Sequence, residues 1–174
     1  MAGLEKSKEP LKTEMRTESL LGRTQQVFFS LDNNGEKMSQ PFTYEVDFSK
    51  SAEIDAENLN TRQFNRKIKH LLTEGHGSIT IKNPGAKHSI GVGILNRLNL
   101  RIEGSLGYFG LGLLDGPNVT VEGRVGWSCG ENMMSGTVLI KKNAGSTFGA
   151  AIRGGDLVCR GDVGARTGID QKGG

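Results

Sequence analysis

A spacing of 19 residues runs through the last hundred residues of this chain. Three of its 26 glycines precede position 75, so the other 23 lie between positions 75 and 174. Many of these glycines, and four columns of apolar residues, recur at intervals of 19. A fixed period of this kind is typical of repeat architectures, in which each unit buries its apolar face against the next. The columns are Ile81, Leu100, Val119, Val138 and Leu157; Ile102, Val121, Ile140 and Cys159; Leu106, Val125, Ala144 and Val163; and Leu95, Leu114, Met133 and Ile152.

Each repeat contains a short strand followed by glycine corners. The sequence VTVEG, residues 119–123, alternates apolar and polar side chains as a β-strand does. Corners of a tight coil need a positive φ or a close backbone approach, and we expect Gly126, Gly145 and Gly164 to share a positive φ. These features predict an all-β fold, a parallel β-helix (solenoid) with 19-residue rungs, about five in number. The structural corner glycines are Gly85, Gly104, Gly107, Gly123, Gly126, Gly130, Gly145, Gly149, Gly161, Gly164 and Gly168.

The residues before the repeat divide into an extension and a helix. Residues 1–59 form an N-terminal extension that is partly irregular. Within it, QVFFSL and TYEVDFS have the β-branched and aromatic content of two short strands, with Asn34-Gly35 as the turn between them.

Residues 60–74 are predicted to form a capping helix. Asn60 and Gln63 have the spacing of a capping box, and Leu59 with Phe64 that of a hydrophobic staple. We expect the apolar face of this helix to cover the first rung of a β-helix that occupies residues 75–174. That face consists of Phe64, Ile68, Leu71 and Leu72.

Composition and charge exclude several classes of protein. The net charge of +3 comes without a Lys/Arg cluster, which argues against a nucleic-acid partner. The N-terminal residues have mixed charge and no apolar core, so they predict neither a signal peptide nor a membrane anchor. We therefore expect a cytoplasmic protein with no membrane partner. Cys129 and Cys159 are far apart and the chain has only three histidines, which predicts reduced structural thiols and no metal site.

No catalytic or cofactor-binding constellation is evident in the glycine-rich segment. The GVG at 91–93 and the GLG at 110–112 resemble fragments of a dinucleotide fingerprint, but the third glycine is missing and no helix follows. The aspartates lie at different offsets within the repeat, which favours a role in turns. A carbohydrate-active β-helix enzyme remains an alternative, and it would need a cluster of carboxylates or basic groups on one face. The aspartates are Asp115, Asp156, Asp162 and Asp170.

Two outward-facing columns have distinct chemistry. Tyr108 and Trp127 occupy equivalent positions on adjacent rungs, so their rings should stack. Either the pair only stabilises the solenoid, or it is exposed and forms an anchor patch for another chain. The second column is charged, and we expect one contact of opposite sign in it, between Glu122 and Lys141. This column consists of Glu103, Glu122, Lys141 and Arg160.

The glycine spacing resembles that of a known family. The spacing G-x-x-G-x-x-x-G at residues 123–130 and 161–168, together with ITIKNPGAKHSIGVG at 79–93, is similar to the GXGXG domain. That domain is a right-handed parallel β-helix that closes the large subunit of glutamate synthase. It also forms a separate subunit in glutamate synthase-like complexes such as N-methylglutamate synthase. The resemblance covers residues 75–174.

The resemblance implies a noncatalytic structural subunit or domain of a glutamate synthase-like oxidoreductase complex. The chain would pack, in a hetero-oligomer, against a glutamine amidotransferase subunit and an FMN/iron–sulfur subunit, and would itself bind no cofactor. Ala2 agrees with this role, because a class II amidotransferase needs an N-terminal Cys nucleophile. We expect the partner contacts at the open last rung and at Tyr108 and Trp127. A more distant relative, the C subunit of formylmethanofuran dehydrogenase, is an alternative scaffold role.

Overall fold

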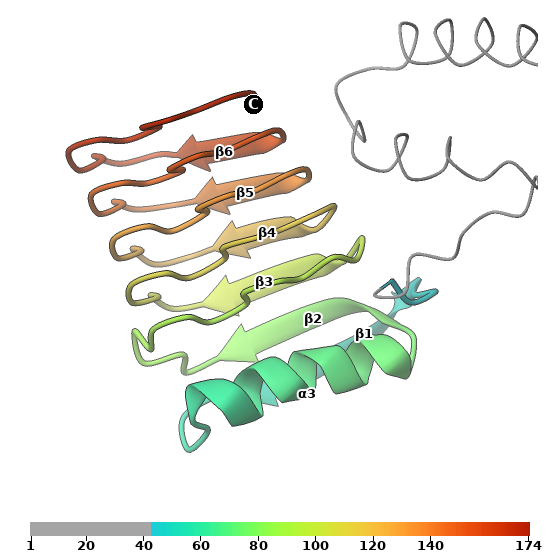
Figure 1. The fold of residues 1–174 in the computed structure, drawn as a ribbon. Helices are drawn as coiled ribbons and strands as arrows, with labels where there is room; N and C mark the ends of the chain where they lie inside the picture. Colours follow the sequence, from blue (N-terminus) through green and yellow to red (C-terminus); the bar gives the residue numbers. More distant parts are fainter. Residues whose placement is uncertain (1–42) are drawn as a thin grey trace, which may run out of the picture. The chain divides into compact units, whose positions relative to one another are not determined.

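The computed structural model describes residues 43–174 of the chain. Within this range the fold is a β-solenoid built around one parallel sheet of six strands in the order β1-β2-β3-β4-β5-β6 (Figure 1). One α-helix, α3, lies between the first two strands. The expected strand at 26–31 and the turn at Asn34-Gly35 lie outside the described residues. The elements are β1 (Asp47–Asp55), α3 (Thr61–Thr73), β2 (His76–Lys82), β3 (Asn99–Glu103), β4 (Asn118–Val121), β5 (Thr137–Ile140) and β6 (Asp156–Cys159).

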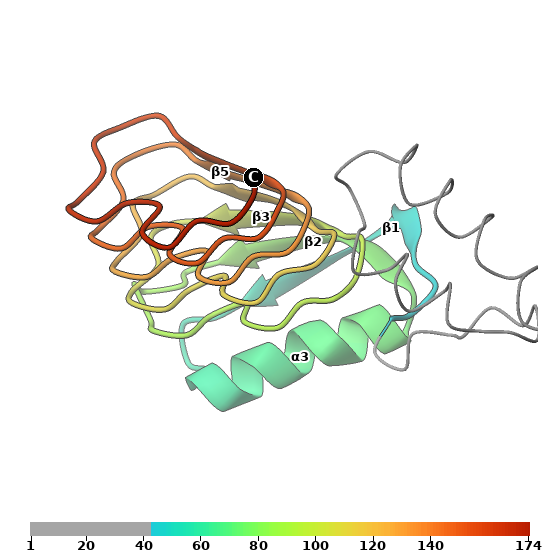
Figure 2. The same cartoon turned by 45° about the horizontal axis from the view of Figure 1, so that its top comes forward.

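The strand register confirms the 19-residue period from β3 onward. Leu100 pairs with Val119, which in turn pairs with Val138 and then Leu157. Their side chains point inward, where Val121, Ile140 and their neighbours form a continuous apolar core. Because each coil stacks its apolar residues on those of the next, the buried core runs from Ile54 to Ile152. In the last coil Leu157 and Cys159 are partly buried, and Val163 is exposed. Figure 2 shows the stacked coils obliquely, one behind another.

The first coil is longer than the period predicts. Ile79, not Ile81, pairs with Leu100, so β2 and β3 are offset by 21 residues, and the placing of Ile81 in the column of Leu100 is wrong. Later in the same coil Ile94 is buried beside Leu114, where the period had placed Leu95. The extra residues belong to this coil alone, and a period measured on the following coils cannot reveal them.

The corner glycines serve two separate purposes. Gly130, Gly149 and Gly168 have positive φ values of 73°, 66° and 66°. Gly126, Gly145 and Gly164 do not, so the expectation of a positive φ at these three is wrong. They are required because the neighbouring coil is too close for a side chain, as detailed below for Gly145.

The glycine column that began at Gly85 also changes. Lys82 pairs with Glu103, which places Asn83 rather than Gly85 beside Gly104. Gly85 has its own positive φ of 60° and supports a turn that only the first coil contains.

The helix forms where the sequence predicts it. The Asn60 side chain accepts a hydrogen bond from the Gln63 N–H at 2.9 Å, and the Gln63 side chain accepts one from the Asn60 N–H at 3.0 Å. This is the predicted capping box, with Asn60 as the N-cap of α3. Phe64, Ile68 and Leu72 are buried in the core, and Leu71 is partly buried against it.

The sheet starts before the helix. β1 pairs in parallel with β2, with Ile54 opposite Ile81, so α3 is a crossover between two parallel strands. The helix therefore closes the first coil on the side where the later coils have loops (Figure 2). The strand expected at 43–49 is shifted, because residues 43–46 carry no strand and β1 begins at Asp47. Gly77 permits this pairing, since a Cβ there would lie 2.6 Å from the Asp47 carbonyl oxygen.

Candidate interaction surface

The aromatic side chains at equivalent corners form a stack on the outside of the solenoid. The ring centroids of Tyr108 and Trp127 are 5.2 Å apart and the ring planes differ by 27°, as the period predicts for the pair. The two side chains are 43% and 57% exposed. The rings therefore contact each other and still offer an apolar surface to a partner.

A histidine that the sequence did not suggest extends this stack. The His88 ring lies on the Tyr108 ring, with centroids 4.8 Å apart and an angle of 16° between the planes. The backbone N–H of Tyr108 donates a hydrogen bond of 2.8 Å to Nδ1 of His88. Nδ1 is thus an acceptor, and the neutral ring carries its proton on Nε2. A 19-residue step back from Tyr108 reaches Ser89, so only the longer first coil places His88 here. We refer to His88, Tyr108 and Trp127 as the aromatic column.

The glycines of the neighbouring coils make room for the aromatic column. A Cβ on Gly126 would lie 2.6 Å from Cδ1 of Tyr108, and a Cβ on Gly145 would lie 2.6 Å from Cδ1 of Trp127. Each ring thus lies against the glycine of the following coil. The column ends at Trp127, because the next position is occupied by Ser146.

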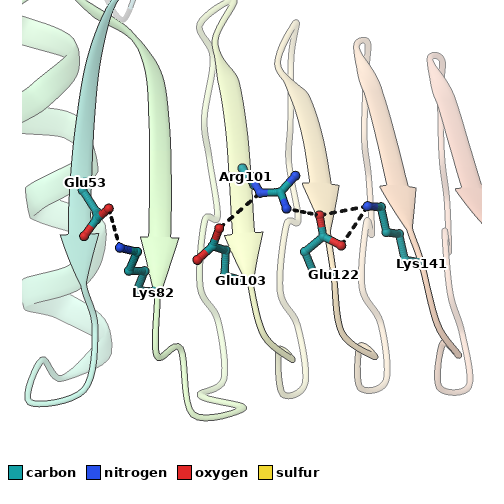
Figure 3. A network of polar contacts seen from close by, with 6 residues as sticks. All are labelled: Glu53, Lys82, Arg101, Glu103, Glu122 and Lys141. Atoms are coloured by element: carbon teal, nitrogen blue, oxygen red, sulfur yellow. Dashed lines mark hydrogen bonds and ion pairs between the residues drawn. The ribbon is translucent and has the colours of Figure 1, made fainter.

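Three members of the charged column, Glu103, Glu122 and Lys141, are drawn on the outer face of the sheet in Figure 3. The Glu122 carboxylate accepts from Nζ of Lys141 at 2.8 Å, which confirms the predicted contact, and from Nη2 of Arg101 at 2.8 Å. Arg101 also reaches Glu103 at 3.3 Å. The hydrogen bond from Lys141 is the main cause that lowers the pKa of Glu122, with the charge of Arg101 adding to it. These residues neutralise one another, which is how a solvated structural ladder behaves.

The aspartates of the glycine-rich segment contact separate neighbours. Asp115 accepts a hydrogen bond from the Ser135 hydroxyl at 2.5 Å, and Asp162 accepts one from the Asn143 amide at 3.4 Å. Asp170 pairs with its near neighbour Lys172. Within residues 43–174 no three His, Cys, Asp or Glu side chains gather into a possible metal site.

Both cysteines are free thiols. Burial, with a smaller contribution from Cys159, raises the pKa of Cys129 to about 12, so this thiol stays protonated at neutral pH. The Cys159 thiol donates to the Lys142 carbonyl at 3.0 Å. A protonated, buried thiol is neither a good nucleophile nor a good metal ligand, which fits a structural role for Cys129.

A hollow of about 540 Å³ lies between α3 and the coil loops beside it. Asn65 and Lys69 of the helix form one wall. The loops line the rest with the apolar Val92, Phe109 and Leu113 and with the polar Ser89, Ser128, Glu131 and Asn132. Phe109 and Leu113 are 54% and 48% exposed and have positive φ values of 57° and 55°. We call this hollow the α3 groove. The groove could not be predicted from the sequence, because apolar residues at these positions cannot be distinguished from core residues without the strand register.

Comparison with protein-family models, with curated proteins and with solved structures finds no match for this chain. In the part of the chain that the structure describes, no helix has the length and apolar character needed to cross a membrane.

Proposed function

We propose that this chain is a noncatalytic structural subunit or domain of a glutamate synthase-like oxidoreductase complex, of the glutamate or N-methylglutamate synthase type. In this role the solenoid packs against a glutamine amidotransferase part and an FMN-binding part. Glutamine hydrolysis, FMN and iron–sulfur chemistry belong to the partner chains, and the assembly works in the cytoplasm.

The observation that carries the proposal is the use that the fold makes of the G-x-x-G-x-x-x-G spacing. In the coil from 123 to 130, Gly126 allows close contact with the previous coil and Gly130 provides a left-handed turn. Gly164 and Gly168 have the same two tasks two coils later. The spacing that resembles the GXGXG domain is therefore a requirement of this coil geometry, which supports a common architecture.

The aromatic column supports an interaction role. Exposed Tyr and Trp side chains are the residue types that most often anchor protein–protein interfaces. On this chain they lie at corners where backbone hydrogen bonds join successive coils: Ser89 N–H donates to the Tyr108 carbonyl at 2.9 Å, and Phe109 N–H to the Trp127 carbonyl at 2.8 Å. A backbone held in this way loses little conformational entropy when a partner covers the rings.

Purification of the affinity-tagged full chain from cells of its source organism tests the proposal. We expect a glutamine amidotransferase chain and a flavin-containing chain to co-purify, identified by mass spectrometry and by the visible absorbance of FMN. The isolated chain should show no glutaminase activity and no bound flavin. Glutaminase or flavin-dependent activity of the isolated chain would overturn the scaffold role.

The same experiment separates the alternatives. Recovery of molybdenum or tungsten enzyme chains would indicate the formylmethanofuran dehydrogenase role. Release of sugars from polysaccharide by the isolated chain would indicate a carbohydrate-active enzyme. Either result would replace the glutamate synthase assignment.

A further inference from the structure

Helix α3 carries an unbalanced positive charge. Its thirteen residues, TRQFNRKIKHLLT, include four Arg and Lys side chains and no Asp or Glu. None of the four forms an ion pair within residues 43–174. This contrasts with the outer face of the sheet, where Lys82, Arg101 and Lys141 are each paired. The four cations are Arg62, Arg66, Lys67 and Lys69.

Lys69 lines the α3 groove, and two further cations share its side of the helix. Arg62, Arg66 and Lys69 have the spacing i, i+4 and i+7, which places them in one row along the helix. Lys69 lines the groove together with Asn65. Asn65 fixes the helix against the loops, since its amide donates to the Ser89 carbonyl and its oxygen accepts from the Gly91 N–H, both at 2.9 Å. We call Arg62, Arg66 and Lys69 the basic row. Lys67 is exposed on another side of the helix.

The loop side of the groove carries the apolar Val92, Phe109 and Leu113 beside the polar Ser128, Glu131 and Asn132. Phe109 and Leu113 hold a backbone conformation that is unfavourable for such side chains. A positive φ suits Gly, Asn and Asp, and a bulky side chain such as that of Phe109 or Leu113 is disfavoured there. In the next coil the corresponding residues are Ser128 and Asn132, with φ values of 54° at both. Phe109 and Leu113 are half exposed, so the fold gains only part of the burial that such side chains offer. A partner that buried these two side chains would supply the remaining hydrophobic stabilisation.

We propose that the α3 groove receives an acidic polypeptide segment of a partner protein. Carboxylates of the segment pair with the basic row, and its apolar side chains insert between Phe109, Leu113 and Val92. This inference rests on the proposed scaffold role and adds where one partner binds and what its binding segment looks like. An amphipathic acidic helix meets both requirements, because it presents one charged and one apolar face.

The shape and the side chains favour a protein segment over other anionic surfaces. The site is hollow, with Phe109 and Leu113 among its lining, whereas a flat bilayer surface is contacted by apolar groups that project from a convex tip. Single-stranded nucleic acid binds through stacking on free aromatic faces. Among the lining residues of the groove Phe109 alone offers such a face, and its neighbours Val92 and Leu113 are aliphatic, so successive bases have no series of rings to stack on.

Peptide binding to the full chain tests the proposal. The probe is a fluorescein-labelled helical peptide of about 20 residues with Leu at i, i+3, i+4 and i+7 and Glu at the remaining positions. The matched probe has Lys in place of every Glu. Fluorescence anisotropy should show binding of the Glu peptide and none of the Lys peptide. Equal binding of the two peptides, or no binding of either, overturns the proposal. Tighter binding to vesicles of 7:3 phosphatidylcholine and phosphatidylserine, or to poly(U), also overturns it.

Matched variants locate the binding site. Lys69→Glu should lower the affinity for the Glu peptide about tenfold or more. Lys67→Glu makes the same charge change on the same helix and should leave that affinity within about twofold of the wild type. The double variant Phe109→Ser, Leu113→Asn should also lower the affinity for the Glu peptide about tenfold. These two replacements copy Ser128 and Asn132, which occupy the same backbone conformation, so the fold should tolerate them. Equal effects of Lys69→Glu and Lys67→Glu would refute the groove as the site.

Co-purification separates this inference from the scaffold role. If the tagged wild-type chain recovers amidotransferase and flavin chains and Lys69→Glu recovers them equally, the scaffold role holds and the groove proposal fails. If no such chains are recovered, but the Glu peptide binds and depends on Lys69, the complex assignment fails and the groove still binds an acidic segment.

Discussion

Gly145 offers the sharpest test of how the coils are held together. It lies opposite Gly126 and Trp127 of the preceding coil, and its N–H donates to the Val125 carbonyl at 3.0 Å. A Cβ at this position would lie 2.6 Å from Cδ1 of Trp127, 2.7 Å from the carbonyl carbon of Gly126 and 2.8 Å from the N of Trp127. Two of these three atoms belong to the backbone, so no rotamer change relieves the contact. Gly145→Ala must therefore push the two coils apart.

The expected cost follows from these distances. Ordinary contacts of a Cβ begin at 3.4 Å, so the backbone of the preceding coil has to withdraw by about 0.7 Å. Overpacking of this kind costs about 1–3 kcal/mol. The hydrogen bond to Val125 lengthens as well, and weakening it adds about 1 kcal/mol. Ala also lowers the conformational entropy of the unfolded chain relative to Gly, which stabilises the folded state by about 0.4–1 kcal/mol. We expect Gly145→Ala to lower the free energy of unfolding by about 2 kcal/mol.

Gly93→Ala provides the control. Gly93 has a φ of 69°, and a Cβ there would have no atom within 4 Å. Alanine at this position bears only the left-handed backbone cost of about 1–2 kcal/mol, less the same gain from the unfolded chain. Urea unfolding followed by circular dichroism measures both variants against the wild type. If Gly145→Ala is no less stable than Gly93→Ala, the closeness of the coils is not what requires glycine at 145, and the reasoning is refuted.

The aromatic pair, the helix cap, the charged column and the buried thiol each provide a further test. Replacing Tyr108 and Trp127 together with Ser should weaken partner assembly by about 2 kcal/mol or more, with the circular dichroism of the isolated chain unchanged. Undiminished recovery of partner chains would remove the pair from the interface. Asn60→Ala should lower the free energy of unfolding in urea by about 1 kcal/mol, because an N–H at the start of α3 loses its acceptor; an unchanged midpoint would contradict this. The pKa of Glu122 is lowered, chiefly by a hydrogen bond from a lysine, so its stabilisation is complete above the ordinary value of 4.5 and is lost as the pH falls through the folded-state pKa. Glu122→Gln should therefore lose less stability than the wild type between about pH 5 and pH 3, and parallel curves would argue against the effect. Cys129, with its pKa raised to about 12, should resist iodoacetamide in the folded protein and react after unfolding, as followed by mass spectrometry.

The repeat could be predicted from the sequence because many residues report the same period. From Leu100 onward every coil has the same length, so the columns through Val119, Val138 and Leu157 support one another. The first coil has no second copy to compare with. Its length of 20 to 21 residues, and with it the position of His88, depends on the pairing of β2 with β3, and a period measured elsewhere gives no information about that pairing.

The bounds of β1 were predicted wrongly for a different reason. Its sequence, DFSKSAEID, buries only Ile54, with Ala52 partly buried, so it lacks the alternation that reveals an internal strand. It is an edge strand, and its place is determined by pairing with β2. The α3 groove was missed because the exposure of Phe109 and Leu113 depends on how the loops fold back beside the helix. Local sequence does not encode that arrangement.

The corner glycines and the exposed aromatic rings are linked by the geometry of the stack. The rings of Tyr108 and Trp127 lie over Gly126 and Gly145, where a Cβ would occupy the space of the ring edge. Gly164 shows that the glycine is needed even without a ring, since a Cβ there would lie 2.7 Å from the carbonyl carbon of Gly145, beside the small Ser146. The close spacing of the coils is therefore a property of the backbone and does not depend on the aromatic residues. The rings pack over glycines that this spacing already requires. For this reason we expect the fold to tolerate Ser in place of the rings, whereas Ala in place of the glycines beneath them should destabilise it.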